Sequence, residues 1–321
     1  MQSTISVVMA TYNGKEYIIE QLESIRLQTR PVTEVIICDD CSKDNTVELV
    51  QSYIDKYNLS GWSIEVNEKN LGYGSNFYKA ISKATGDFIF FADQDDIWML
   101  NKFEIMVGLM EQKPEIKLLC SEYEIFSTGE KVPEYAKNYG KDNLRDKSLK
   151  KINLTPHNIF IGSLGCDMCI RKDFFEEIKP YWFDGWAQDE YVWKLAQCAE
   201  GCYMYHEPLI KHRVHASNVS MHKIHNIDKR IQFLEDLERG NEACKKYILD
   251  TSKNQKHLKI INKNIKSEKL RIQMLKTGKI HYAIPLLFYN RYYHSRKSLL
   301  MEPWIALKNK RQMKSTQNTS N

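Results

Sequence analysis

Residues 87–96 read DFIFFADQDD, an apolar run that ends in a cluster of carboxylates. Other apolar runs occur at residues 5–10, 34–38, 63–66 and 117–120, and segments of helical period separate them. Short apolar runs that alternate with amphipathic helices are typical of a parallel sheet with crossover helices. The first 120 residues therefore predict a doubly wound α/β domain.

Two of the intervening segments carry an apolar stripe that can cover such a sheet. The first stripe repeats at i, i+4 and i+7 and the second at i, i+3, i+7 and i+10. Their members are Ile18, Leu22 and Ile25 in the first segment and Val47, Val50, Ile54 and Tyr57 in the second. Farther along, residues 122–156 are polar without a sustained period and predict a surface excursion, whereas residues 189–198 predict a short helix.

The composition is that of a globular protein, with 42% hydrophobic and 27% charged residues in a chain of 321. No run of eighteen apolar residues occurs, and the first residues lack the basic start and cleavage site of a signal peptide. We therefore expect a cytoplasmic protein. Eight cysteines are present without the knuckle turns of zinc sites, so we expect buried thiols in a reduced chain.

The C-terminal part differs in charge from the rest of the chain. Residues 251–321 hold sixteen Lys and Arg against two Glu, a balance of +14, whereas the whole chain carries +5. The first 250 residues must therefore carry −9. After residue 220 the pattern is helical and basic, so we predict a domain at 1–220 followed by a helical extension at 221–321.

The acidic turn after residues 87–92 contains Asp93, Asp95 and Asp96. Like charges this close need a cation or must partly protonate. Mg²⁺ or Mn²⁺, held by one or two carboxylates with substrate phosphates completing the shell, fits oxygen ligands. The alternative is that these acids cap the helix expected to begin near Asn101.

Ligands of doubly wound sheets bind beyond the carboxyl ends of the strands. Polar turns stand at these positions here, at residues 11–13, 39–42, 67–74 and 93–96. Asp40, after the second strand, can accept hydrogen bonds from a base or a ribose. Ser42 or Asp44 is then free to begin the following helix.

Four motifs, in this order, resemble family 2 of the glycosyltransferases: ATYNG (10–14), DDCSKDNT (39–46), NLGYGSNF (70–77) and FADQDDIW (91–98). Farther along, WAQDEY (186–191) resembles the catalytic-acid region of the family, and RVHASN (213–218) resembles a stretch of its rhamnosyltransferase-like members. The resemblance covers about two thirds of the chain. It implies the GT-A fold, a Rossmann-like doubly wound mixed sheet, here with a C-terminal helical extension.

Two departures from the family pattern stand out. Cys41 replaces the usual glycine of the DDGS turn, and Gln188, Asp189 and Glu190 replace a His-Asp-Trp sequence common among the rhamnosyltransferase-like members. The second departure lies where the acceptor is expected, so it leaves the donor sugar and the acceptor open.

The resemblance also implies which residues hold the nucleotide. Ala10, Tyr12 and Asp40 are expected to contact the base, with Asp40 accepting a hydrogen bond from an N–H of uracil or thymine. Asp93 is expected to contact the ribose or the metal ion.

The same resemblance implies the reacting groups. Asp95 is the expected principal metal ligand, while Arg213 and His215 secure the diphosphate or complete the metal shell. Asp189 is the expected general base, and Glu190 is the alternative base. Either acid could instead be a surface residue of a helix.

We therefore expect an inverting glycosyltransferase that uses Mn²⁺ or Mg²⁺. It would transfer a sugar from a UDP-sugar or dTDP-rhamnose to a hydroxyl of a saccharide or lipid-linked saccharide. The expected process is cell-surface polysaccharide synthesis. One alternative, a nucleotidyltransferase, would normally show a Gly-rich, Arg-containing loop after the first strand, and ATYNG lacks both features. Another alternative, nucleic-acid binding by the basic tail, has only the charge in its favour, so we expect no nucleic-acid partner.

Residues 1–220 would then be the catalytic domain, with a nucleotide-sugar half at about 1–120 and an acceptor half at about 121–220. In the extension, residues 280–293 (IHYAIPLLFYNRYY) mix apolar and aromatic side chains with basic ones. Such a mixture favours peripheral attachment to the anionic inner face of the membrane. The alternative is a helical cap on the catalytic domain with solvated lysines.

Overall fold

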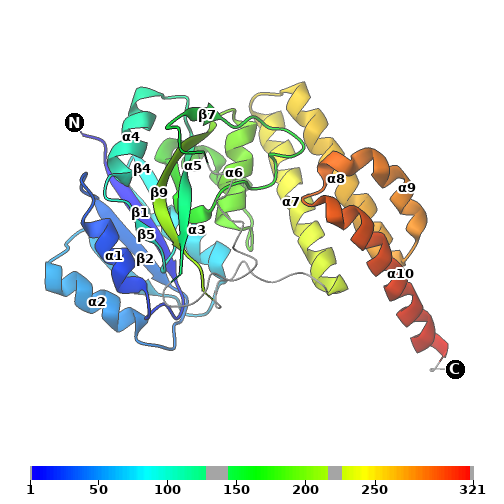
Figure 1. The fold of residues 1–321 in the computed structure, drawn as a ribbon, viewed down its shortest axis with the longest axis horizontal. Helices are drawn as coiled ribbons and strands as arrows, with labels where there is room; N and C mark the ends of the chain where they lie inside the picture. The colour runs from blue at the N-terminus through cyan, green and yellow to red at the C-terminus, as the bar shows by residue number, and fades with distance from the viewer. Residues whose placement is uncertain (1, 128–143, 216–225, 319–321) are drawn as a thin grey trace. The chain divides into compact units, whose positions relative to one another are not determined.

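The computed structural model describes residues 2–127, 144–215 and 226–318 (Figure 1). The chain forms two compact units, the first made of Met1–Asn153 with Ile161–Asn218 and the second of Leu154–Phe160 with Val219–Asn321. The predicted boundary at residue 220 falls outside the described residues.

Unit 1 is a mixed sheet flanked by helices. Its strands and helices are β1 (Ile5–Thr11), α1 (Ile18–Arg26), β2 (Glu34–Asp39), α2 (Thr46–Tyr57), β3 (Trp62–Val66), α3 (Tyr73–Lys83), β4 (Phe88–Ala92), β5 (Ile97–Trp98), α4 (Lys102–Gln112), β6 (Leu118–Phe126), β7 (Leu149–Lys151), the 3-10 helix η1 (Gly165–Asp167), β8 (Met168–Arg171), α5 (Lys172–Ile178), the 3-10 helix η2 (Lys179–Tyr181), α6 (Gln188–Cys198) and β9 (Cys202–Arg213). The described strands join in the order β3-β2-β1-β4-β8-β6-β9-β5, and β7 pairs with β9.

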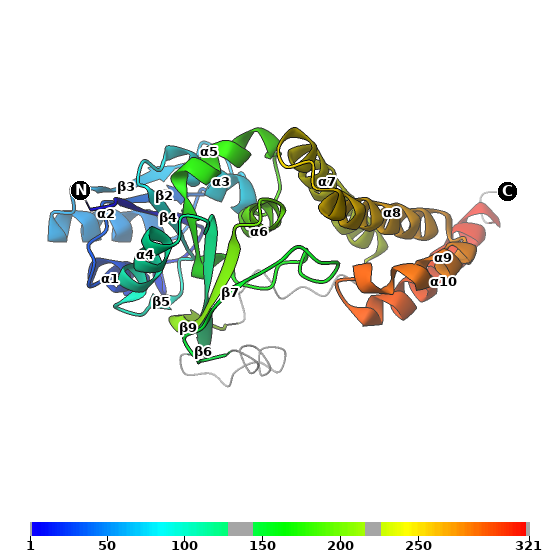
Figure 2. The same cartoon turned by 90° about the horizontal axis from the view of Figure 1, so that it is seen from above.

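The first four strands run parallel, as the sequence predicts. β1 lies between β2 and β4, and its residues are almost all buried because helices cover both faces of the sheet. On one face, α1, α2 and α4 pack against side chains such as Val7 and Phe90. On the other, Phe77 of α3 packs against Phe91 of β4, and α3 and α6 lie together on that side in Figure 2. The predicted α/β class with a doubly wound mixed sheet is confirmed.

One sequence-based expectation for this unit is wrong. The predicted surface excursion begins within a strand, because β6 extends to Phe126. Its polar second half pairs in parallel with β9, with Tyr123 opposite Ile210 and Phe126 opposite Arg213. This pairing satisfies the backbone groups of residues whose side chains do not show a strand pattern. Residues 128–143 of the excursion lie outside the described part of the chain.

Unit 2 is helical. Its helices are α7 (Ile227–Asp250), α8 (Gln255–Thr277), the 3-10 helix η4 (Ile280–Tyr282), α9 (Ala283–Leu286), the 3-10 helix η5 (Leu287–Tyr292) and α10 (Arg296–Asn318). The buried carboxylate of Glu302 on α10 accepts hydrogen bonds from Arg230 on α7 and from Arg271 on α8, and so links three helices. Among the described helices, none is both long enough and apolar enough to cross a membrane.

Candidate active site

The loops after β1 and β2 are joined by hydrogen bonds at the carboxyl edge of the sheet. The Thr11 hydroxyl donates to Asp39 Oδ2 at 2.8 Å, the Asn13 amide donates to Ser42 Oγ at 2.8 Å, and the Gly14 amide donates to Thr46 Oγ1 at 2.8 Å. These bonds fix both turns in place without using the exposed side chain of Tyr12. The predicted base-contacting residues Ala10 and Tyr12 therefore lie on a rigid edge.

Cys41 occupies a turn position that favours glycine. Its φ is +65°, in the left-handed region where a side chain is strained. Its thiol donates to the carbonyl of Asn67 at 3.1 Å, which compensates in part for that strain. The departure from the family glycine is thus accommodated locally.

Asp40 is buried and organises the loop after β3. Its Oδ1 accepts from the Asn67 side chain at 2.9 Å and from the Leu71 amide at 2.7 Å, and its Oδ2 accepts from the Gly72 amide at 2.9 Å. A carboxylate has about four acceptor sites, and three of them are used here. Contact with a base, as the motif implies, depends on the remaining site of Oδ2.

Gln94 connects the acidic turn to the loop after β1. The Tyr12 amide donates to Gln94 Oε1 at 2.9 Å, and Gln94 Nε2 donates to the Tyr12 carbonyl at 3.1 Å. Because Gln94 stands between Asp93 and Asp95 in the sequence, this pair of bonds ties the acidic turn to the loop after β1. A Cβ at Gly14 would lie only 2.3 Å from Gln94 Oε1, so a larger residue there would displace the Gln94 side chain.

Asp93 lies among like charges. Burial, followed by the negative charges of Asp96, Asp95 and Asp189, raises the pKa of Asp93 to about 8. An acid held this way is readily converted to the ionised form by a bound cation. Asp189, in the N-terminal turn of α6, makes the smallest contribution among these negative charges to the raised pKa of Asp93.

Asp95 and His215 form a pair at the outer side of this group. His215 Nε2 lies 2.8 Å from Asp95 Oδ2, and both side chains remain partly exposed. Two ligands about 2.1 Å from one ion and at right angles to each other stand about 3 Å apart, so this separation suits joint coordination. The donor set of one carboxylate and one imidazole fits the predicted metal centre.

Asp96, unlike Asp95, is fully buried and contacts the C-terminal end of β9. Its Oδ1 accepts from the Arg213 amide at 3.0 Å and lies 2.9 Å from His212 Nδ1. Burial lowers the pKa of His212, but Asp96 outweighs this effect and the pKa rises to about 9. His212 is therefore protonated and pairs with the ionised carboxylate of Asp96. This buried ion pair links the acidic turn to the end of β9.

A second group of metal-ligand types includes the same pair. One ligand atom each of Asp96, Cys166 and His212 lies within 4.8 Å of the others, and all three residues are buried. The imidazolium already neutralises Asp96, and burial raises the pKa of the Cys166 thiol well above its usual range. An ion pair beside a neutral thiol explains this group better than a metal site does.

Arg213 is fully buried and acts on the site through other residues. Its Nε donates to the Asp95 carbonyl at 2.7 Å and one terminal nitrogen donates to Glu20 at 2.7 Å. The guanidinium also lies over the rings of Tyr17 and Phe126, at 4.3 and 4.5 Å. In this arrangement Arg213 positions the Asp95 backbone.

Asp189 lies in the first turn of α6, half-buried. Its Oδ1 accepts from the Glu190 amide at 2.7 Å. Burial raises its pKa to about 6, although that hydrogen bond lowers it. A base with a pKa near neutrality is well placed to take a proton and release it again.

Short backbone approaches bring α6 to the rest of the site. A Cβ at Gly165 would lie 3.4 Å from Asp189 Cβ, and the adjoining Cys166 is the residue grouped with Asp96. A Cβ at Gly74 of α3 would lie 2.4 Å from the Trp186 carbonyl. Asp189 is therefore brought to the same edge of the sheet as the acidic turn.

Glu190, the alternative base, is engaged elsewhere. Its Oε1 lies 2.6 Å from Nζ of Lys194, one turn farther along α6, and Lys194 is buried. A carboxylate that neutralises a buried ammonium is a weaker candidate for proton transfer than Asp189.

Sequence reasoning missed the structural roles of Gln94 and of the pair Asp96 and His212. The position of Gln94 between Asp93 and Asp95 in the motif could have indicated its role. The pair joins residues 116 positions apart, and only the pairing of β5 with β9 brings them together.

Comparison with known proteins agrees with this geometry. The family model described as glycosyl transferase family 2 matches residues 6–178. The chain is 33% identical over 131 residues to WfgD of Escherichia coli, a UDP-Glc:alpha-D-GlcNAc-diphosphoundecaprenol beta-1,3-glucosyltransferase. The match covers 41% of this chain and 50% of WfgD. It is 28% identical over 223 residues to the dTDP-rhamnosyl transferase RfbG of Shigella flexneri, over 65% of this chain and 72% of the relative.

A third relative, TarS of Staphylococcus aureus, is named a poly(ribitol-phosphate) beta-N-acetylglucosaminyltransferase. Its sequence is 41% identical over 93 residues, which are 28% of this chain and 16% of TarS, so the chain matches only a small part of that protein. The crystal structure of TarS 1–349 with UDP has a TM-score of 0.61 at 17% identity and covers 99% of this chain and 92% of the other. This likeness confirms the predicted GT-A fold.

Proposed function

The chain belongs to glycosyltransferase family 2, and from this premise we propose that it moves a sugar from a nucleoside-diphosphate donor to a hydroxyl of a saccharide acceptor with inversion at the anomeric carbon. The observation that carries the proposal is the close approach of Asp189 to Gly165, whose neighbour Cys166 lies beside Asp96 of the acidic turn. Carboxylates gathered from two separate elements provide both a cation site and a base.

The nucleoside would lie along the ends of β1 and β2. Tyr12 offers an exposed ring for stacking on the base, and Asp40 offers one remaining acceptor site for a pyrimidine N–H. Ala10 is small enough to leave room between them. Asp93 would accept a hydrogen bond from the ribose, or assist in holding the cation, once neighbouring charges are neutralised.

Asp95 and His215 would hold Mn²⁺ or Mg²⁺. The imidazole favours a transition ion, hence Mn²⁺, over Mg²⁺, which prefers oxygen ligands. When bound, the ion neutralises charge that grows on the departing diphosphate, an effect commonly worth several kcal/mol. Arg213 contributes by fixing the Asp95 backbone, which modifies the direct diphosphate contact implied by the motif.

Asp189 would act as the general base. Its carboxylate takes the proton of the acceptor hydroxyl while that oxygen forms a bond to the anomeric carbon. The bond from this carbon to the diphosphate oxygen breaks on the opposite face, and its electron pair leaves with the nucleoside diphosphate. Proton transfer of this kind contributes about 10²- to 10⁴-fold to the rate.

We propose a UDP-sugar or dTDP-rhamnose as donor. The similarity to RfbG over most of its length favours dTDP-rhamnose, whereas the similarity to WfgD and the UDP complex of TarS favour a UDP-sugar. WfgD is named for a diphosphoundecaprenol-linked acceptor. A lipid-linked saccharide at the cytoplasmic face of the membrane, with the 221–321 extension attached there, is accordingly the proposed acceptor and place of reaction.

Donor turnover tests the proposal. Purified protein is incubated with UDP-sugars and dTDP-rhamnose, with Mn²⁺ or with EDTA, and release of the nucleoside diphosphate is measured. We expect one donor to be consumed with Mn²⁺ and not with EDTA, and Asp95→Asn to abolish its consumption. Release of pyrophosphate from a nucleoside triphosphate with a sugar phosphate would instead indicate a nucleotidyltransferase and contradict the proposal.

A further inference from the structure

The surface of residues 251–309 has no exposed carboxylate among its described side chains. The acids of this segment are Glu268 and Glu302, and both are about 1% exposed. Glu302 is neutralised by Arg230 and Arg271, and Glu268 accepts from Asn241 at 2.7 Å. The outer surface of this segment therefore presents only positive and neutral groups.

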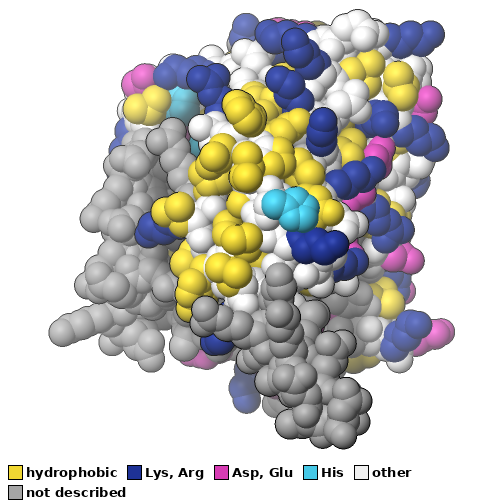
Figure 3. All heavy atoms as spheres, turned by 90° about the vertical axis from the view of Figure 1, so that its right-hand side faces the viewer, with side chains coloured by type: hydrophobic (Ala, Val, Ile, Leu, Met, Phe, Trp, Pro, Cys, Tyr) yellow, Lys and Arg dark blue, Asp and Glu magenta, His cyan; other side chains and the backbone are white. Residues whose placement is uncertain are grey.

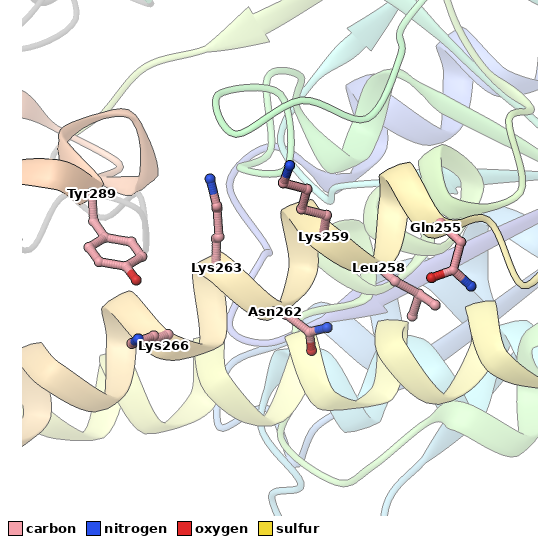
Figure 4. A pocket seen from close by; sticks show the side chains of 7 residues that line it. All are labelled: Gln255, Leu258, Lys259, Asn262, Lys263, Lys266 and Tyr289. Carbon is pink, nitrogen blue, oxygen red and sulfur yellow. The ribbon is translucent and has the colours of Figure 1, made fainter.

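A groove in this unit is lined by lysines. It has a volume of about 640 Å³ and lies between one face of α8 and Tyr289 of η5. Figure 4 shows Lys259 and Lys263 extending in the same direction from α8, with the Tyr289 hydroxyl turned toward the helix. The lining residues are Gln255, Leu258, Lys259, Asn262, Lys263, Lys266 and Tyr289.

These lysines differ from Lys269 and Lys276, farther along α8, in having no acidic partner among the described residues. Lys269 lies near Glu238 and Glu242, and Lys276 near Glu235, all on α7. Within the described part of the chain, Lys259, Lys263 and Lys266 form no ion pair. Seven residues of α-helix span about 10 Å, so three unneutralised charges line a short stretch of the groove.

An exposed apolar surface adjoins the groove in sequence. The exposed fractions are 66% for Ile284, 60% for Leu287 and 85% for Phe288. Tyr289, which lines the groove, follows directly. With Ile280, these residues repeat at i, i+4, i+7 and i+8, the spacing of one helical face.

The neighbouring helix α10, which contacts η4 and η5, has a similar face. Its exposed residues are Leu300, Met301, Trp304 and Leu307. Figure 3 shows hydrophobic side chains gathered on this side of the molecule, with Lys and Arg around them. Soluble proteins rarely expose so much apolar surface unless something binds it.

The charge of this surface limits what can bind there. A second copy would bring the same positive groups together, and a nucleic acid would leave Phe288 and its neighbours in water. An anionic bilayer satisfies both features, because apolar side chains enter the acyl boundary while lysines meet lipid phosphates. Lys308 lies over the Trp304 ring at 5.6 Å, a pairing suited to the headgroup level.

We propose that unit 2 contains an anionic-phospholipid site, in which Lys259, Lys263 and Lys266 bind lipid phosphate and the segment around Leu287 and Phe288 enters the bilayer. This site specifies how the proposed attachment to the membrane would occur. It rests on the proposed function only in that the attachment would bring the enzyme to a lipid-linked acceptor. Lipid binding itself is independent of catalysis.

Flotation of the full-length protein with vesicles tests the site. The vesicles are phosphatidylglycerol with phosphatidylethanolamine, and vesicles of phosphatidylcholine alone serve for comparison. We expect binding to the anionic vesicles only. The triple variant Lys259→Gln/Lys263→Gln/Lys266→Gln should bind about 100-fold less tightly, at about fivefold per lysine.

The apolar contribution is tested separately. Leu287→Ser/Phe288→Ser should reduce vesicle binding at least about tenfold, since each buried side chain of this size contributes about that factor. The matched control is Leu27→Ser/Leu100→Ser, which removes two exposed leucines of unit 1. For charge, the control is Lys56→Gln/Lys113→Gln/Lys150→Gln, at exposed positions of the same unit. Both controls should bind as the wild type does.

Three outcomes would overturn the site: no flotation with anionic vesicles, equal losses in the control and test variants, or inorganic phosphate competing fully at millimolar concentration. Binding of a fluorescent RNA that is lost in the triple lysine variant while vesicle binding persists would also overturn it. Nucleotide-sugar turnover in detergent-free solution is measured in parallel. Loss of turnover with intact flotation would count against the proposed function and not against the lipid site.

Discussion

Replacement of Asp189 by Asn should lower kcat by about 10²- to 10⁴-fold, equivalent to about 3–5.5 kcal/mol of transition-state stabilisation. Asparagine has the same shape and keeps an oxygen that can accept from the Glu190 amide, a bond of 2.7 Å in the wild type. The fold should therefore persist. Binding of the donor should also persist, because its expected contacts come from the ends of β1, β2 and β4.

The matched variant is Glu190→Gln. It removes the charge that lies 2.6 Å from buried Lys194, so it should destabilise the protein while kcat changes by less than about tenfold. The assay is nucleoside-diphosphate release with the donor and acceptor at saturating concentration, beside a thermal melt of each variant. If Asp189→Asn keeps a kcat within about threefold of the wild type, or Glu190→Gln loses more, the assignment of the base is refuted.

The same side chain predicts the acidic limb of the pH profile. Burial raises the pKa of Asp189 to about 6, and a base acts only when it is deprotonated. The wild-type kcat/KM should therefore fall about tenfold per pH unit below about pH 6. The residual activity of Asp189→Asn should lack this limb, and its persistence would assign the ionisation to another group.

Two further predictions concern stability. Gly74→Ala places a Cβ 2.4 Å from the Trp186 carbonyl and should destabilise the protein by about 1–3 kcal/mol in chemical denaturation. The control is Gly108→Ala, whose Cβ would meet no described atom within 4 Å and which should stabilise the protein by about 1 kcal/mol. Equal effects of the two substitutions would disprove the close approach at Gly74. Asp96 raises the pKa of His212 to about 9 in the folded protein, whereas the unfolded value is about 6.5. The stabilisation by this ion pair should therefore be complete below about pH 6.5. It should be lost, by up to about 3 kcal/mol, as the pH rises through 9. The free energy of unfolding of His212→Gln should lack this loss, and an unchanged pH dependence would show that another group causes it.

The parallel half of the sheet could be predicted from the sequence because its strands are buried on both faces. β1, β2 and β4 are almost wholly buried, and each observed strand begins and ends within about one residue of the predicted run. The face of α1 that Ile18, Leu22 and Ile25 form is buried, as predicted. Local pattern was sufficient wherever one element packs on its neighbours in sequence.

The other half of the sheet, in which parallel and antiparallel pairs are mixed, could not be predicted in the same way. The second half of β6 is polar, and it is a strand because β9, some eighty residues later, supplies its hydrogen bonds. The pairing of Asp96 with His212 depends on the same long-range contact. The motif locates Arg213 beside the site but does not show that its side chain is buried.

Calorimetric titration with a nucleoside diphosphate, UDP and dTDP in turn, tests the central claim most directly. In the wild type, Mn²⁺ should increase the affinity for one of them at least about tenfold, consistent with coordination by Asp95 beside the diphosphate. Asp95→Asn should remove that increase, whereas Asp189→Asn should preserve it because the proposed role of Asp189 is to accept the proton of the acceptor hydroxyl. Nucleotide binding that is indifferent to Mn²⁺, or a Mn²⁺ effect that survives in Asp95→Asn, would contradict the account.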